Sequence, residues 1–278
     1  MSGFSAQWLQ LREPLDAASR AAGLCRYLLE DLAFKQRQGS RLEIIDLGAG
    51  TGANLRYVAP LLGGVQDWLL VERDPTLLAA GESRMRDWTA PFECSVRYLE
   101  LDLAAQLDQL PLPAGALLTA SALLDLVSEA WLRDLARRAA RADAPIWFAL
   151  TYDGRIECLP AEPEDAQIRE LFNLHQLHDK GFGPALGPRA GRMAEQIFIE
   201  HGYRLQSEPS DWRIGPQSPA LQAALIEGWF DAACEVAPHR AQALSGWLAR
   251  RRAHVEAARS ELRIGHVDVI GRPGNNGA

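Results

Sequence analysis

The stretch EIIDLGAGTGAN, Glu43 to Asn54, decides the fold of this chain. The apolar pair Ile44 and Ile45 predicts a buried strand, the three closely spaced glycines predict a tight turn, and the apolar residues that recur after Asn54 predict a helix. Strand, glycine turn and helix together form the first half of a nucleotide-binding βαβ unit. The stretch therefore predicts an α/β fold with a nucleotide-like ligand at the turn.

The nature of that ligand depends on Asp46. The letters GAGTGA satisfy the dinucleotide fingerprint G-x-G-x-x-G/A, with Ala53 in the last place, so the glycines alone do not exclude a nicotinamide enzyme. A pyrophosphate would bring like charge towards Asp46, two residues before Gly48, whereas an ammonium and a sulfonium would be attracted. S-adenosylmethionine carries both cations, so we interpret Asp46 as a cofactor residue. The alternative is that Asp46 only caps the turn.

Apolar segments with strand and helix periodicity alternate through the rest of the chain. This alternation predicts a doubly wound parallel sheet with helices on both faces. The expected strands are 44–47, 68–72, 96–102, 117–120, 146–152, 203–206 and 266–270, and the expected helices are 54–62, 75–88, 129–141, 165–178, 192–201, 220–236 and 240–260.

The segment DLGAGTGAN resembles the first motif of class I S-adenosylmethionine-dependent methyltransferases. The resemblance covers 41–153 and, more loosely, the closing strands to Ile270. It implies a Rossmann-like methyltransferase sheet, mostly parallel with an antiparallel last strand, and S-adenosyl-L-methionine as cofactor. It also implies that Glu72 holds the ribose hydroxyls and that Asp102 lies near the adenine amino group, although both could be solvated surface carboxylates. The implied cofactor set is Asp46, Gly48, Ala49, Gly50, Gly52, Asn54, Glu72, Arg73, Asp102, Leu103 and Ser121.

The end of the fourth strand, TASALLDLVS, lies under the reactive methyl group in the family that the chain resembles. Ser121 and Ala122 would then line the cofactor. Asp125 either faces the pocket or caps the following helix, and both interpretations stay open. The N/D-P-P-Y/F/W signature of enzymes that methylate amino groups of bases or protein amides is absent, which argues against such a target.

Four charged residues gather in the N-terminal stretch WLQLREPLDAASRA, namely Arg12, Glu13, Asp16 and Arg20. Asp16 and Arg20 are four residues apart and would pair as a salt bridge on a helix surface. The functional alternative is a lid over the cofactor in which Arg12 meets the cofactor carboxylate, as the resemblance implies for N-terminal helices.

The stretch after the fifth strand is expected to form the acceptor side. His175 and His178 are three residues apart, but no third ligand has suitable spacing, so we predict no metal site. A general base, a substrate hydrogen bond and a plain helix end all remain possible for them. The glycine-rich loop that follows would suit a mobile gate. The catalytic candidates are His175, His178 and Tyr152, and the candidate substrate-binding residues are Arg12, Asp125, Asp153, Lys180 and Arg189, with Lys180 and Arg189 suited to an anionic acceptor.

We expect one domain over 1–271, comprising an N-terminal helical lid (1–38), a cofactor-binding core (41–153), a substrate-side insertion (154–189) and closing elements (190–271). A flexible tail (272–278) would follow. The net charge of −7 argues against a general nucleic-acid binder, and four widely spaced cysteines without a signal peptide or membrane segment predict a cytoplasmic protein.

The predicted function is methyl transfer from S-adenosylmethionine to a small-molecule acceptor by in-line displacement. The alternatives are a nicotinamide-dependent oxidoreductase and a catalytically silent cofactor-binding module. The oligomeric state and the methylated atom are not predicted.

Overall fold

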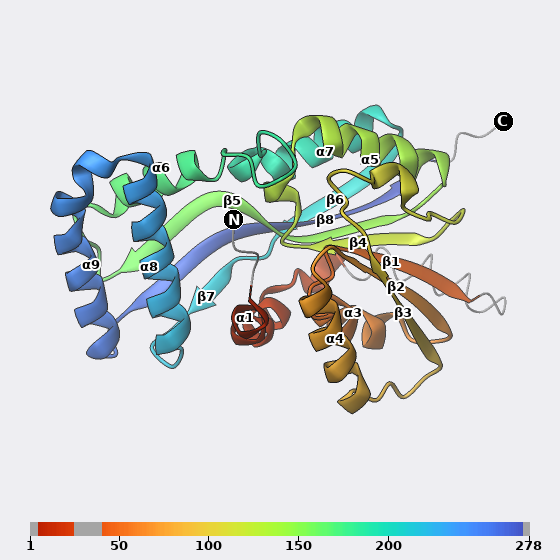
Figure 1. Cartoon of the computed structure of the whole chain (residues 1–278), viewed down its shortest axis with the longest axis horizontal. Helices are drawn as coiled ribbons and strands as arrows, with labels where there is room; N and C mark the ends of the chain where they lie inside the picture. The colour runs from red at the N-terminus through yellow and green to blue at the C-terminus, as the bar shows by residue number, and fades with distance from the viewer. Residues whose placement is uncertain (1–4, 25–40, 275–278) are drawn as a thin grey trace.

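The centre of the molecule is one eight-stranded sheet (Figure 1). The computed structural model describes residues 5–24 and 41–274. The strands are β1 (Leu42–Leu47), β2 (Gln66–Glu72), β3 (Cys94–Glu100), β4 (Leu117–Ser121), β5 (Ile146–Leu159), β6 (Tyr203–Pro209), β7 (Trp212–Ile214) and β8 (Glu261–Pro273). Their order is β3-β2-β1-β4-β5-β8-β6, and β7 pairs with β8 off this path. The neighbours from β3 to β5 pair in parallel and β8 is antiparallel to all its partners, which confirms the predicted sheet.

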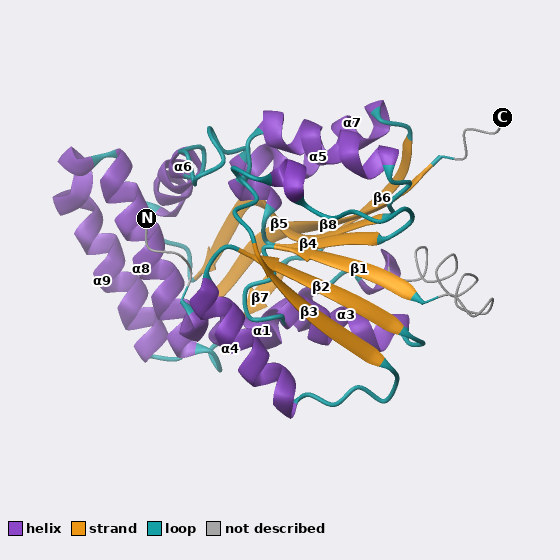
Figure 2. Cartoon of the chain, turned by 45° about the vertical axis from the view of Figure 1, so that its right-hand side comes forward, coloured by secondary structure: helices purple, strands orange, loops and turns teal. Residues whose placement is uncertain are grey.

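Helices cover both faces of this sheet (Figure 2). One face carries α3 (Ala53–Leu62) and α4 (Pro75–Asp87), with α1 (Ala6–Ser19) beside α3. The other face carries α5 (Glu129–Arg141) and α7 (Ala190–Glu200). Ile44 of β1 packs in the same apolar cluster as Leu55 of α3, whereas its neighbour Ile45 packs in the cluster of Leu135 of α5. Successive strand residues point to opposite faces, so a continuous apolar run needs two helix layers.

Local signals in the sequence set the ends of the first elements. Asp74 accepts a hydrogen bond from the N–H of Thr76 at 2.8 Å and so caps α4. In the turn between β1 and α3, Gly48, Gly50 and Gly52 have φ of 61°, 54° and 77°. L side chains rarely adopt this region, so the turn requires its glycines.

Strands β5 and β8 stay paired with each other as they extend away from the parallel strands, and they carry a second lobe, seen at the left of Figure 1. Its helices are α6 (Asp165–His175), α8 (Pro219–Val236) and α9 (Ala241–Glu256). Trp229 of α8 and Trp247 of α9 are buried in the same apolar cluster as Leu55 of α3. The lobe and one face of the sheet therefore share a core.

Two expected boundaries between the parts of the domain differ from the structure. The insertion 154–189 was expected to leave the sheet at residue 154, but β5 continues to Leu159 in antiparallel pairing with β8. The expected tail 272–278 starts too early, because Arg272 and Pro273 pair with β6. Pairing with a distant segment prolongs both strands, and local periodicity does not show such pairing. The parts of the predicted lid at 1–4 and 25–38 lie outside the described residues.

Candidate functional site

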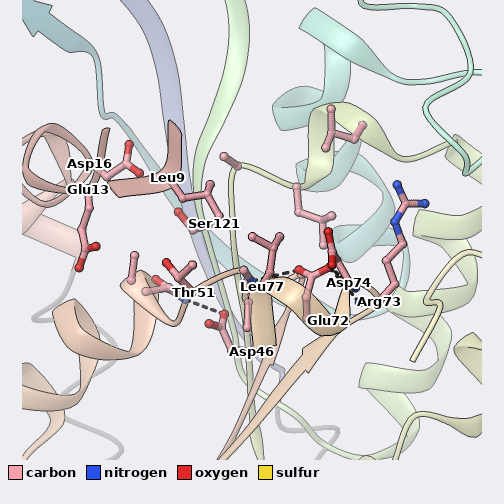
Figure 3. A pocket seen from close by; sticks show the side chains of 18 of the residues that line it. Leu9, Glu13, Asp16, Asp46, Thr51, Glu72, Arg73, Asp74, Leu77 and Ser121 are labelled. Carbon is pink, nitrogen blue, oxygen red and sulfur yellow. Dashed lines mark hydrogen bonds between the residues drawn. The ribbon is translucent and has the colours of Figure 1, made fainter. Parts of the chain in front are cut away.

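A cavity of about 750 Å³ lies at the carboxyl ends of the parallel strands. Figure 3 shows Glu13 and Asp16 of α1 on one side of it and Glu72 and Arg73 on the other. Gly52, by contrast, is the N-terminal capping residue of α3 and does not line the cavity. The carboxyl ends of the strands, where the cavity lies, are where ligands bind in open α/β sheets. The expected cofactor residues that line the cavity are Asp46, Gly48, Ala49, Gly50, Asn54, Glu72, Arg73, Asp102, Leu103 and Ser121.

The carboxylate of Glu72 is fixed at the end of β2. Its Oε2 accepts a hydrogen bond from the N–H of Gly50 at 3.0 Å, and its Oε1 accepts from the N–H groups of Arg73 and Asp74 at 2.8 and 3.1 Å. These bonds hold the carboxylate against the glycine turn. Since each carboxylate oxygen has two lone pairs, Glu72 can also accept hydrogen bonds from ligand hydroxyls.

A buried polar chain runs beneath the glycine turn. Asn54 Nδ2 donates to Asp46 Oδ1 at 2.8 Å, and Arg20 Nη1 donates to Asn54 Oδ1 at 2.9 Å. Among the described residues, neither Asp46 Oδ2 nor Arg20 Nη2 has a hydrogen-bond partner, although both side chains are buried and line the cavity. Buried polar groups are normally hydrogen-bonded, so these two atoms fit a ligand with one cationic and one anionic end.

Burial dominates the electrostatics of Asp46. It raises the pKa of the carboxyl to about 7, while the hydrogen bond from Asn54 and the charge of Arg20 act in the opposite direction. The ionised form is therefore costly near neutral pH, and a bound cation would stabilise it.

Helix α1 forms one wall of the cavity and pairs its charges differently from the prediction. Arg12 Nε donates to Asp16 Oδ2 at 2.8 Å, so the expected Asp16–Arg20 pair is wrong. The helix ends at Ser19, and Arg20 continues in extended backbone, which turns its guanidinium inward. Arg20 Nε lies 3.5 Å from Asp268 Oδ2 on β8, and both side chains are buried.

Glu13 joins α1 to the helices α3 and α4. Its Oε1 accepts from Arg56 Nε of α3 at 2.7 Å, and its Oε2 accepts from Arg84 Nη1 of α4 at 2.8 Å. Sequence reasoning noted Glu13 only as a neighbour of Arg12, because its partners come from two other helices.

The loop after α6 lies over the cavity at the end of β3 and β4. Phe182 lines the cavity and contacts Trp131 edge-on, with ring centroids 5.3 Å apart. Trp131 Nε1 in turn donates to the carbonyl of Leu103 at 2.7 Å. Asp179 fixes the loop by accepting the N–H of Gly183 at 2.9 Å. Sequence reasoning missed Phe182, although an aromatic residue between two glycines in this loop was a usable signal.

Of the candidate substrate-binding residues, Arg12 and Lys180 line the cavity, whereas Asp125, Asp153 and Arg189 do not. Burial raises the pKa of Asp125 to about 6, and its Oδ1 has no hydrogen-bond partner within the described ranges. The capping interpretation of Asp125 is wrong, because Ser128 caps α5.

The three catalytic candidates also lie outside the cavity lining. The hydroxyl of Tyr152 donates to Asn173 Oδ1 at 2.7 Å, and burial raises its pKa. His175 Nε2 lies 3.0 Å from Glu235 Oε2 of α8, and the ring of His178 packs 5.3 Å from that of His175. Direct contact with a ligand in the cavity is therefore not available to these side chains in this structure.

Two further findings concern the described part of the chain. It holds no group of three or more His, Cys, Asp or Glu side chains arranged to bind a metal ion. None of its helices has the length and apolar character needed to span a membrane.

Comparison with known proteins supplies structural neighbours only. No family model and no curated protein matches the chain. A putative methyltransferase from Bacillus halodurans is 12% identical, with a TM-score of 0.49 over 88% of this chain and 100% of that one. A cyclopropane synthase from Mycobacterium tuberculosis is 11% identical, with a TM-score of 0.42 over 83% and 78%. A putative sarcosine dimethylglycine methyltransferase from Galdieria sulphuraria is 13% identical, with a TM-score of 0.41 over 90% and 86%.

These likenesses are distant and are no basis for assigning a reaction. The strand order and the helices on both faces are nevertheless those of the class I S-adenosylmethionine-dependent methyltransferase fold. The chain has this fold.

Proposed function

We propose that this chain is a cytoplasmic enzyme that transfers a methyl group from S-adenosyl-L-methionine to a small-molecule acceptor. The observation that carries the proposal is the pair of buried, incompletely bonded groups, Asp46 and Arg20, on either side of Asn54. An α-amino acid end carries an ammonium and a carboxylate, which complement these two side chains. A pyrophosphate would instead offer Asp46 no cation to stabilise its ionised form and would repel that form.

Different residues around the cavity would bind different parts of the cofactor. Asp46 and Arg20 would hold the amino acid end of the cofactor, Glu72 the ribose hydroxyls, and Asp102, Leu103 and Phe182 the adenine. Arg20 replaces Arg12 in this proposal, because the Arg12 guanidinium is engaged by Asp16 and lies 5.2 Å from the Trp212 ring.

The acceptor would enter between α1 and the loop after α6. Arg12 and Lys180 line this end, which suits an acceptor with an anionic group. When bound, the cofactor supplies a methyl group already activated on sulfur. The protein therefore chiefly has to align the acceptor, exclude water and receive a proton.

Calorimetry with S-adenosylhomocysteine and NAD tests the cofactor. We expect S-adenosylhomocysteine to bind in the micromolar range and NAD not to bind. Glu72→Ala should weaken binding by about 1–3 kcal/mol, since the ribose hydroxyls lose a charged acceptor. Binding of NAD, or unchanged affinity in Glu72→Ala, would contradict the proposal.

Turnover distinguishes an enzyme from a silent binding module. The protein is incubated with S-adenosylmethionine labelled in its methyl group and a metabolite extract, and labelled products are identified by mass spectrometry. A labelled small molecule that forms more slowly with the Glu72→Ala protein at limiting cofactor supports the enzyme. Cofactor binding without any labelled product would favour the silent module.

A further inference from the structure

One of the two cationic residues at the proposed acceptor end of the cavity, Lys180, is of a type that is rare in this chain. Of its 29 lysine and arginine residues only Lys35 and Lys180 are lysines, and Lys180 lines the cavity. Arginine stays protonated in proteins, whereas lysine can lose its proton when it is partly buried. Lys180 therefore offers chemistry that the arginines of the site do not.

Lys180 is connected to the surface through His175. Its Nζ lies 3.4 Å from His175 Nδ1 and 3.2 Å from the His175 carbonyl, and His175 Nε2 lies 3.0 Å from Glu235 Oε2. Because a carboxylate can only accept, Nε2 carries the imidazole proton and Nδ1 is free to accept one from Lys180. The side chain of Glu235 is 69% exposed, so the chain of contacts ends in solvent.

We propose that Lys180 is the general base of the reaction and that His175 and Glu235 relay its proton to solvent. This inference rests on the proposed methyl transfer. It also restricts the acceptor to molecules whose nucleophilic atom carries a proton, an O–H or an N–H. His175 acts through Lys180 and is a positioning and relay residue.

The protons and electrons balance along this path. The Lys180 ammonium first gives a proton to His175 Nδ1, and the proton of Nε2 passes to Glu235 and then to water. The neutral amine takes the proton of the acceptor as the acceptor lone pair bonds to the methyl carbon, and the pair of the broken C–S bond stays on sulfur. Lys180 is again an ammonium, and the next cycle begins once exchange of the ring protons with solvent has returned the His175 proton from Nδ1 to Nε2.

The charges around Lys180 are consistent with this role. Burial lowers the pKa of Lys180, and the carboxylates of Glu235 and Asp125 oppose that shift. Burial, and then the charges of Lys180 and His178, lower the pKa of His175, with Glu235 opposing. Both groups are thus shifted towards their neutral forms, which a base and its proton acceptor require.

The titration of Lys180 can be measured without an acceptor. The protein, with S-adenosylhomocysteine present, is acetylated by trace acetic anhydride across a pH series, together with Nα-acetyl-lysine amide as a standard. Mass spectrometry of the peptide that contains Lys180 gives the extent of its acetylation relative to the standard at each pH. We expect Lys180 to titrate below this standard. Glu235→Gln and Asp125→Asn should each lower the midpoint further, because each removes a carboxylate that favours the ammonium. His201→Gln, at the end of α7 and outside the cavity lining, should leave it unchanged. If Lys180 titrated at the same pH as the standard in the unaltered protein and in every variant, the proposal would be overturned.

Lys180→Arg separates a base from a fixed cation once the labelling experiment has identified the acceptor. The variant keeps the charge but cannot deprotonate, so we expect single-turnover transfer to fall at least about 100-fold with cofactor affinity unchanged. Lys180→Ala should regain activity with added ethylamine, and His175→Gln should move the pH of half-maximal rate upward. Full transfer by Lys180→Arg would overturn the proposal. Failure of S-adenosylhomocysteine to bind would contradict the proposed function instead.

Discussion

At the scale of single residues, ligand binding and stability conflict at Asp46. Its pKa is raised to about 7 in the folded chain, against an ordinary value of 3.8. The fold therefore disfavours the ionised carboxyl, so stability is lost as the pH rises from about 4 to 7. We predict that Asp46→Asn increases the free energy of unfolding at pH 8 by on the order of 2–4 kcal/mol, with a smaller gain at pH 5.

Urea unfolding at the two pH values checks this prediction. The amide introduced by Asp46→Asn would keep a hydrogen bond to Asn54 but would no longer attract an ammonium, so affinity for S-adenosylhomocysteine should fall as stability rises. Equal stability of both proteins at pH 8 would show that the Asp46 carboxylate is better solvated than its burial indicates.

Arg20 and Arg12 differ in how far their guanidinium groups are already engaged by other side chains. Arg20 is buried and, within the described residues, its Nη2 has no hydrogen-bond partner, whereas Arg12 is paired with Asp16. We predict that Arg20→Lys weakens S-adenosylhomocysteine binding about 10- to 100-fold, because a charge-assisted bond to the carboxylate is lost. Arg12→Lys should change it less than about threefold, because that guanidinium is already engaged.

A truncated ligand is the control for that comparison. 5′-Methylthioadenosine lacks the amino acid end, so calorimetry should give the same affinity for it in the Arg20→Lys and unaltered proteins. Equal losses for both ligands would mean that Arg20 supports the fold of the site and does not contact the carboxylate.

At the scale of elements, α1 is held by ion pairs from two directions. Glu13 binds Arg56 of α3 and Arg84 of α4, and Arg20 reaches Asp268 in β8. We predict that Glu13→Gln speeds amide hydrogen exchange across Ala6–Ser19 about fivefold, equivalent to ~1 kcal/mol for part-buried pairs.

Hydrogen exchange measured by mass spectrometry tests this prediction. Glu129→Gln removes an exposed pair with Arg133 on α5 and should leave α1 unchanged. Bound S-adenosylhomocysteine should slow exchange in α1, since binding stabilises the covered site. Identical exchange in Glu13→Gln would show that packing alone holds the helix.

The part of the sheet that carries the glycine turn was predictable because its signals are local. Asp46, the glycines and Glu72 lie at strand ends that short apolar runs mark, and parallel strands bring those ends together. The acceptor side was not, because it depends on contacts between distant segments: Glu13 with two other helices, Phe182 with Trp131, and the extension of β5 along β8. The chemistry of an imidazole made His175 a candidate in the sequence. Its place outside the cavity lining depends on where α6 ends, which the sequence did not predict.

At the scale of the molecule, the second lobe is part of the main core. The apolar cluster that contains Leu55 beside β1 also contains Trp229 and Trp247 of the lobe, and β5 and β8 run through both. Opening either part would expose apolar surface of the other, so we expect the two parts to unfold together. We therefore predict that the lobe does not unfold independently of the sheet.

Trp247 tests this coupling. It is fully buried, and its Nε1 donates to Asp165 Oδ1 at 2.7 Å. We predict that Trp247→Ala lowers the free energy of unfolding by about 3–5 kcal/mol, and Trp247→Phe by much less because most of the volume is kept. Circular dichroism, tryptophan fluorescence and loss of S-adenosylhomocysteine binding should share one midpoint in each protein. If the Ala variant still bound S-adenosylhomocysteine after its first transition, the lobe would be a separate folding unit and the shared core would not couple it to the cofactor site.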